Sequence, residues 1–195
     1  MNPHPNYYLP LIEKSYSKEH AKKFEQNIIN NNHTMILREC CAQVMQVFPP
    51  QPYCCAYLSA LLVEITRGKG MQAYLAAGTL DFKNKRLFDY DHSVENTNLV
   101  TKWNGHCWAV LNNAICDVSF FRTAYSDQSP TWLKELVSNN FGAGCGALLA
   151  SNLEMDSFDL HYSPKYIFDD DRLDGLLNSA EKIIFDYWKD PINLQ

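Results

Sequence analysis

The chain is organised around residues 54–70, which read CCAYLSALLVEITRGKG and predict a helix that begins at a cysteine. The prolines in residues 49–52 lack an N–H group and favour extended backbone, so they exclude a regular helix before this point. Apolar side chains then recur every three or four residues, at Leu58, Leu61, Leu62 and Ile65. This spacing is typical of one buried helix face, and the glycines of residues 68–70 end the helix.

A cysteine at the start of a helix has a distinctive chemical setting. The first N–H groups of a helix have no partner within it, and the helix dipole places partial positive charge at this end. Both features lower the pKa of a thiol and stabilise its thiolate, which is the nucleophilic form. The pair Cys54 and Cys55 is therefore a candidate for nucleophilic chemistry.

Length and composition predict one soluble domain that spans residues 1–195. The chain has 195 residues, of which 46% are hydrophobic, enough to bury a sizeable core. Its net charge is −5 and no basic run is longer than two residues. This pattern is not that of a protein that binds nucleic acid or an anionic membrane surface, so we expect neither partner.

The cysteine content and the first residues predict a cytoplasmic protein with free thiols. The seven cysteines are odd in number and include two adjacent pairs, which makes a poor disulfide framework. Residues 1–8 show no basic and then apolar signal sequence, and no stretch has the roughly 18 apolar residues of a membrane span.

The remaining patterns predict an α+β fold. Helices are expected at residues 19–29, from a cap at Thr34 to the prolines at 49–50, at 132–137, and after the acidic residues 169–171. Strands are expected at residues 71–80, 86–90, 99–103, 106–111 and 114–119. We expect the N-terminal helices to pack on an antiparallel sheet and the C-terminal helix to cover it.

The strands at 106–111 and 114–119 form the clearest predicted hairpin, with Asn112 and Asn113 as its turn. This register pairs Trp108 with Asp117 and places His106 opposite Ser119, so these four side chains share one face. Asp117 is then close enough to accept the Nδ1–H of His106, leaving Nε2 for a thiol. Cys107 and Cys116 fall on the opposite face and are expected to be buried packing residues.

Each of these features has a plainer alternative. Cysteine is often simply buried, a histidine can be a hydrogen-bonded core residue, and an aspartate often ends a strand. A zinc site built from Cys54 or Cys55 with His106 and another cysteine is a competing chemistry, although the chain has no C-x-x-C pair. The glycine-rich residues 141–146 resemble a phosphate loop only in part, and the acidic residues 169–171 suit a helix N-terminus without any metal.

Residues 50–120 resemble the transglutaminase-like branch of the papain-like cysteine enzymes. The resemblance rests on Cys55, the glycines Gly70 and Gly78, the run Gly105-His-Cys-Trp-Ala-Val, and the run Cys116-Asp-Val-Ser. It implies that Cys55 is the nucleophile, His106 the base and Asp117 the acid that orients His106. The chain departs from the family in its short His106–Asp117 connection and in having Tyr53 where a small residue is common.

The resemblance implies a hydrolase or acyltransferase that acts on an amide, peptide or thioester bond through a thioester intermediate, without a cofactor. Its substrate would be a peptide, a protein, or a small acyl or amine compound. The backbone N–H of Cys55 would hold the oxyanion, and Gln51, Gln46, Cys54 and Trp108 are weaker candidates for oxyanion or substrate contacts. Hydrolysis and acyl transfer both remain open, and the alternative is a catalytically inactive binding module on the same fold.

Overall fold

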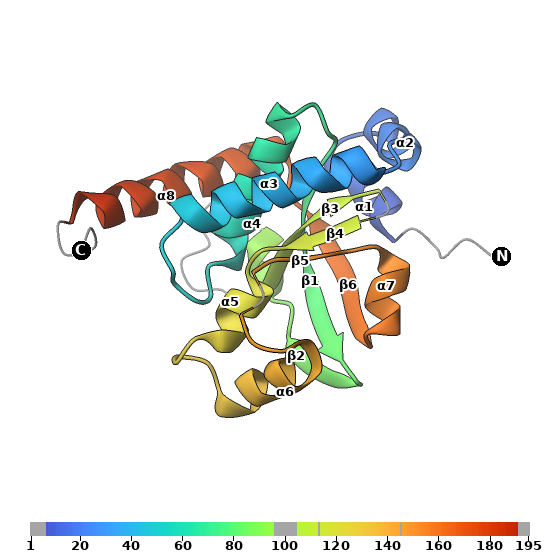
Figure 1. Ribbon diagram of the computed structural model, residues 1–195. Helices are drawn as coiled ribbons and strands as arrows, with labels where there is room; N and C mark the ends of the chain where they lie inside the picture. Colours follow the sequence, from blue (N-terminus) through green and yellow to red (C-terminus); the bar gives the residue numbers. More distant parts are fainter. Residues whose placement is uncertain (1–6, 96–104, 113, 145, 191–195) are drawn as a thin grey trace.

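The computed structural model describes residues 7–95, 105–112, 114–144 and 146–190 and shows a mixed α+β fold (Figure 1). The helices are α1 (Tyr8–Ser15), α2 (Lys18–Gln26), α3 (Asn31–Val47), α4 (Cys55–Gly68), the 3-10 helix η1 (His92–Glu95), α5 (Phe120–Tyr125), α6 (Thr131–Phe141), α7 (Asn152–Ser157) and α8 (Asp170–Lys189). The strands are β1 (Tyr74–Phe82), β2 (Lys85–Phe88), β3 (His106–Leu111), β4 (Ala114–Asp117), β5 (Leu148–Ala150) and β6 (Leu160–Ile167).

Strand β1 is the centre of a single antiparallel sheet. Along one edge it pairs with β6, while its other edge pairs first with β3 and then with β2. Strands β4 and β5 continue the sheet beyond β3. Because β3 and β2 follow one another along the same edge of β1, the first residue of β3 lies close to the last residue of β2.

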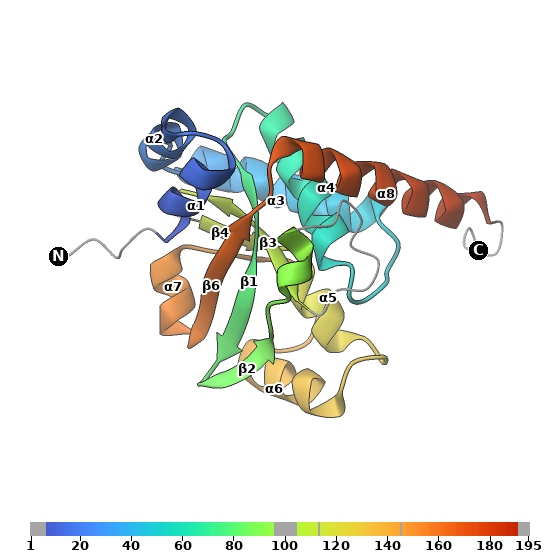
Figure 2. The same ribbon diagram turned by 180° about the vertical axis from the view of Figure 1, so that it is seen from behind.

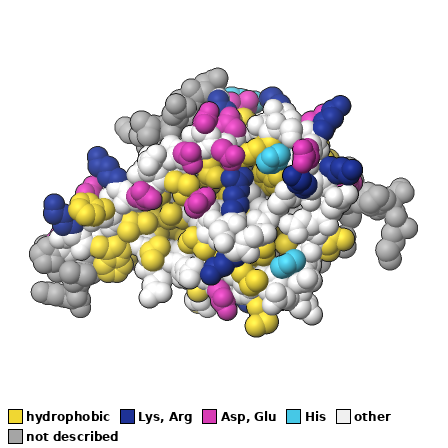
Figure 3. All heavy atoms as spheres, turned by 90° about the horizontal axis from the view of Figure 1, so that it is seen from above, with side chains coloured by type: hydrophobic (Ala, Val, Ile, Leu, Met, Phe, Trp, Pro, Cys, Tyr) yellow, Lys and Arg dark blue, Asp and Glu magenta, His cyan; other side chains and the backbone are white. Residues whose placement is uncertain are grey.

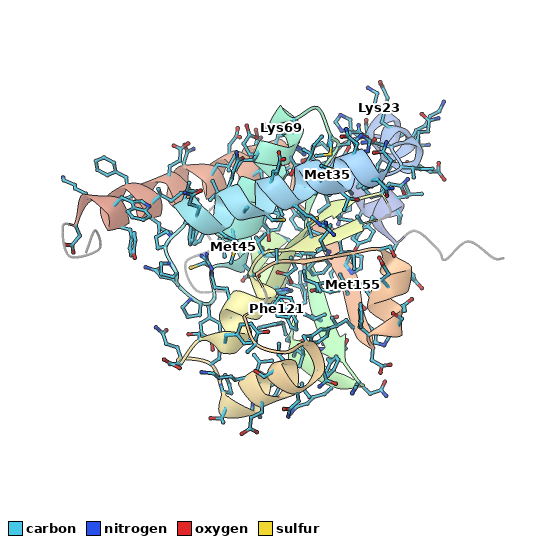
Figure 4. All side chains as sticks on the ribbon, in the orientation of Figure 1. Lys23, Met35, Met45, Lys69, Phe121 and Met155 are labelled. Atoms are coloured by element: carbon cyan, nitrogen blue, oxygen red, sulfur yellow. The ribbon has the colours of Figure 1, made fainter. Side chains whose placement is uncertain are left out.

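Helices cover both faces of this sheet, and each face has its own buried core. Figure 2 shows α3, α4 and α8 gathered on one side, with α1, α2, α6 and α7 elsewhere around the strands. The core under α3, α4 and α8 includes Cys107 and Cys116, and the opposite core includes Trp108. In Figure 4, Met45 lies on α3, whereas Phe121 lies on α5 and Met155 on α7, and both of these belong to the second core.

The C-terminal half of α8 projects from the body of the protein (Figures 1 and 2). It carries exposed aromatic side chains, with Phe185 64% and Trp188 42% exposed. The view from above shows hydrophobic side chains gathered toward this end (Figure 3). Among the described helices, α8 included, none is long and apolar enough to cross a membrane.

Several helices and strands begin or end at residues other than those that the sequence predicts. Helix α3 begins at Asn31 and is capped by Asn30 and His33, so Thr34 lies inside the helix and is not its cap. Strand β4 ends at Asp117, and Ser119 instead precedes α5, so the expected pairing of His106 with Ser119 does not form. The sequence pattern does not predict helices α1, α5 and α7 or strands β5 and β6, and the predicted strand at 99–103 lies outside the described residues.

Candidate active site

The nucleophile candidate Cys55 is the first residue of α4, as the sequence predicts. Cys54 is the N-cap residue and its side chain makes no capping hydrogen bond. Cys55 is 8% exposed, and its Sγ lies 3.7 Å from the carbonyl oxygen of Gly105, the residue that precedes β3. Ser59, one turn later, donates a hydrogen bond to the Cys107 carbonyl, so the first turns of α4 are attached to the beginning of β3.

The hairpin of β3 and β4 has the predicted register, with Ala109 opposite Cys116 and Leu111 opposite Ala114. This register brings His106 and Asp117 together across the hairpin. The imidazole Nε2 lies 2.5 Å from Asp117 Oδ2, and both side chains are buried, His106 at 2% and Asp117 at 0% exposure. The Cys55 side chain also hydrogen-bonds to His106, so the Cys55, His106 and Asp117 side chains are neighbours in the order that the sequence predicts.

The nitrogen assignment within this group differs from the prediction. The hairpin pattern predicts that Nδ1 of His106 faces Asp117, but Nε2 makes this contact. Because an ionised carboxylate only accepts hydrogen bonds, Nε2 carries the proton, and Nδ1 is the nitrogen left for Cys55. The expected chemistry is unchanged, since either imidazole nitrogen can transfer a proton once the other one is held.

Asp117 is held by five donors, which fix both of its oxygens. Oδ1 accepts from the Ser119 N–H, the Ser119 hydroxyl and the Phe120 N–H, each at 2.9 Å. Oδ2 accepts from His106 and from the hydroxyl of Tyr162 at 2.9 Å. Three of these donors come from the turn into α5, so the end of β4 and the start of α5 act as one rigid support.

Aromatic rings enclose the imidazole of His106. Phe88 stacks on it, with ring centroids 4.5 Å apart and an interplanar angle of 12°. Trp108 and Tyr162 approach it at 5.9 Å and 6.2 Å. The sheet register explains this arrangement, because Gly78 of β1 pairs with His106 while Leu80 pairs with both Phe88 and Tyr162. All these side chains therefore lie on one face.

The charges in this group favour a thiolate and an imidazolium. A hydrogen bond from the Cys107 side chain lowers the pKa of Cys55, burial opposes it, and the contact with His106 lowers it further, to about 5. Burial disfavours a charged His106, but Asp117 and Cys55 together raise its pKa to about 10. Burial tends to raise the pKa of Asp117. The charge of His106 and the hydrogen bonds from His106 and Ser119 outweigh this effect and keep the pKa of this carboxyl below its usual value.

Cys107 contacts Cys55, and the strand pattern in the sequence does not predict this contact. The alternation of β3 predicts only a packing residue on the face opposite His106, and Cys107 is indeed fully buried in the core under α4. However, its thiol hydrogen-bonds to Cys55, and burial followed by the Cys55 charge raises the pKa of Cys107 well above its ordinary value. Cys107 therefore remains protonated and is a hydrogen-bond donor to the thiolate. Because side chains alternate between the two faces of a strand, the sequence pattern places Cys107 away from His106 and does not predict its contact with Cys55.

The weaker site candidates lie around this group but do not all face it. Trp108 is fully buried and donates its indole N–H to Tyr8 at 3.1 Å, so it offers a substrate no surface. Gln51 is exposed, and its amide oxygen lies 4.0 Å from Cys54 Sγ. Gln46 is exposed on α3. Burial and then the Cys55 charge raise the pKa of Cys54 to about 11, which distinguishes the two adjacent thiols.

The other motifs have structural roles. Asp169 caps α8 by accepting from the Arg172 N–H, and Asp170 forms an ion pair with Arg67 at 2.7 Å. Within the described residues, no group of three or more His, Cys, Asp or Glu side chains is placed to hold a metal ion. Gly142 ends α6 and, like Gly144, has a positive φ, so the described part of the glycine-rich segment forms the connection from α6 to β5.

Comparison with protein-family models, with curated proteins and with solved structures found no match.

Proposed function

We propose that the protein is a cysteine-dependent hydrolase or acyltransferase that acts on an amide, peptide or thioester bond. The observation that carries this proposal is the grouping of Cys55, His106 and Asp117, with a thiol whose pKa is about 5 beside an imidazole whose pKa is about 10. Between these values the pair exists mainly as thiolate and imidazolium. A buried ion pair at the first turn of a helix is an unusual arrangement for packing residues alone.

In the first step, the Cys55 thiolate attacks the carbonyl carbon of the substrate and forms a carbon–sulfur bond. The negative charge moves to the carbonyl oxygen, and backbone N–H groups at the start of α4, including that of Cys55, would hold it. The bond to the leaving amine, alcohol or thiol then breaks as His106 donates its Nδ1 proton to that group. The product of this step is a thioester on Cys55 and a neutral imidazole.

In the second step, neutral His106 takes a proton from water or from an acceptor amine, which attacks the thioester carbonyl. The carbon–sulfur bond breaks, the acyl group leaves as an acid or an amide, and the thiolate and imidazolium are restored. Asp117 stays ionised throughout and holds the imidazole through Nε2. Which acceptor enters decides between hydrolysis and transfer.

The transglutaminase-like resemblance supports the same proposal. Members of that family have a cysteine at the start of a helix, then a strand with the His-x-Trp pattern, and then a strand that ends in aspartate. The positions of Cys55, His106 and Asp117 in α4, β3 and β4 agree with that order. The α+β architecture is compatible with it, and we propose that the chain is a transglutaminase-like cysteine enzyme.

The first test is alkylation of the native protein by iodoacetamide between pH 5 and 9, followed by peptide mass spectrometry. At pH 6 we expect Cys55 to react about tenfold faster than an ordinary thiol, since nearly all of it is ionised while its lower basicity reduces its intrinsic reactivity. His106→Ala should slow this labelling, and Cys54→Ala should leave it unchanged. An activated ester such as p-nitrophenyl acetate should leave an acetyl group on Cys55.

The second candidate function is a binding module that keeps the fold without catalysis. The exposed aromatic residues of α8, Phe185 and Trp188, are the observation in its favour. Under this alternative, Cys55 would alkylate slowly with a midpoint near pH 8.5, and His106→Ala would change nothing. That result would reject the enzyme proposal.

A further inference from the structure

Tyr162 joins the triad from a part of the chain that the transglutaminase-like resemblance does not cover. It lies on β6, and its hydroxyl donates to Asp117 Oδ2 at 2.9 Å. The same oxygen accepts the Nε2 proton of His106 at 2.5 Å. One carboxylate oxygen thus has two donors, and one of them is the side chain that would exchange protons with Cys55.

The ring of Tyr162 is held firmly enough to keep this hydroxyl in place. It packs against Trp108 in an edge-to-face arrangement, with centroids 5.0 Å apart and an angle of 71°. It also approaches His106, and it borders a cavity of about 480 Å³. Burial, followed by the Asp117 charge, raises the pKa of Tyr162 well above its ordinary value, so the hydroxyl keeps its proton.

We propose that Tyr162 is a positioning residue for the triad: its hydroxyl holds Asp117 Oδ2 in place and reduces the pull of that oxygen on the His106 proton. A second donor takes up part of the negative charge on a carboxylate oxygen, so the first donor is bound less strongly. Tyr162 thereby sets the pH at which His106 releases its proton. Its role in catalysis rests on the function proposed above.

Titratable groups from several elements face the His106 and Asp117 pair and must be kept constant in a test. They are Cys55 of α4, Cys107 of β3, Cys116 of β4, Tyr162 of β6 and Cys41 of α3, and Tyr8 of α1 lies near Tyr162. Of these, Cys55 acts directly on His106 and raises its pKa. A Cys55→Ala background removes this coupling and leaves the contact between Tyr162 and Asp117 in place.

The experiment is an NMR titration of the His106 imidazole in the full chain carrying Cys55→Ala, with and without Tyr162→Phe. Loss of the hydroxyl should move the His106 midpoint upward by at least about half a pH unit, because Asp117 then binds the imidazolium proton more strongly. A stronger donor, 3-fluorotyrosine at position 162, should move the midpoint downward. Opposite shifts from the two changes are not expected from a general loss of packing.

Tyr166→Phe is the matched control. Tyr166 lies on the same strand, and among the described residues its buried hydroxyl has no hydrogen-bond partner, so its removal should leave the His106 midpoint unchanged. A midpoint that stays the same or falls in Tyr162→Phe would overturn the proposal. This failure is distinct from failure of the proposed function, which is read from alkylation of Cys55 in the otherwise unaltered protein.

Discussion

At the scale of single residues, the site depends on which groups touch the Cys55 sulfur. His106 provides the partner charge, while the Cys107 thiol and its backbone N–H both donate to the thiolate. Such donors stabilise an anion most when they are buried, because water does not compete for them. Cys107 is fully buried, and it directly follows His106 in β3.

Replacing Cys107 by alanine tests this contribution. In Cys107→Ala we expect the alkylation midpoint of Cys55 to move from about 5 toward higher pH, because the thiolate loses its strongest donor. Labelling at pH 6 should slow, while labelling at pH 9 should be nearly unchanged. Cys116→Ala is the control, since Cys116 contacts Cys41 rather than Cys55. Equal midpoints in both variants would show that Cys107 is only a packing residue.

At the scale of elements, the site exists because three strands converge on the middle of β1. Gly78 pairs with His106 on one edge and with Pro164 of β6 on the other. A Cβ atom here would overlap the Ser163 carbonyl oxygen and approach a ring carbon of Trp108 at 2.9 Å. The glycine therefore allows β6 to lie close enough for Tyr162 to reach Asp117.

Gly78→Ala should accordingly reduce both stability and the integrity of the site. We expect a loss of about 1–3 kcal/mol in the free energy of unfolding, because the overlap is with backbone that cannot rotate away. Urea denaturation measures this loss. In Gly68→Ala the added Cβ meets nothing within 4 Å in the last turn of α4, so this control should be neutral or stabilising by about 0.5–1 kcal/mol. Equal stability of the two variants would contradict the argument.

At the scale of the whole molecule, Arg67 joins elements from both ends of the chain. From the last turn of α4 it donates to the Ala73 carbonyl at 2.9 Å, to Asp170 at 2.7 Å and to the Tyr16 hydroxyl at 3.0 Å. Tyr16 in turn donates to the Phe168 carbonyl, and Ser15 donates to the Ile167 carbonyl at 2.6 Å. These bonds attach α1, α4 and α8 to the end of β6.

Arg67→Met should lower the free energy of unfolding by about 1–3 kcal/mol, because the buried Ala73 carbonyl and the half-buried Tyr16 hydroxyl lose their donor. The ion pair with Asp170 contributes little of this, since the Asp170 side chain is 62% exposed. Arg67→Lys should therefore recover only a small part of the loss. Arg86→Met, which removes surface ion pairs with Asp81 and Asp89, should cost less than about 1 kcal/mol in the same urea titration. A similar loss in both methionine variants would contradict this role.

The sequence alone determined the elements that obey local rules. The prolines before Cys55 and the apolar spacing after it predict α4, and the two asparagines predict the hairpin that groups His106 with Asp117. The helix after Asp169 follows from the same periodicity and from an acidic cap. These patterns are visible because helix and hairpin contacts join residues close in sequence.

The way in which those elements meet is visible only in the folded protein. Periodicity assigns a side chain to a face, but it does not say which distant strand lies beside it. The pairing of β6 with β1 brings Tyr162 to Asp117, and the end-to-end placement of β2 and β3 stacks Phe88 on His106. The packing of α4 on β3 likewise brings Cys107 into contact with Cys55. These contacts depend on strand order and sheet curvature, which local sequence does not encode.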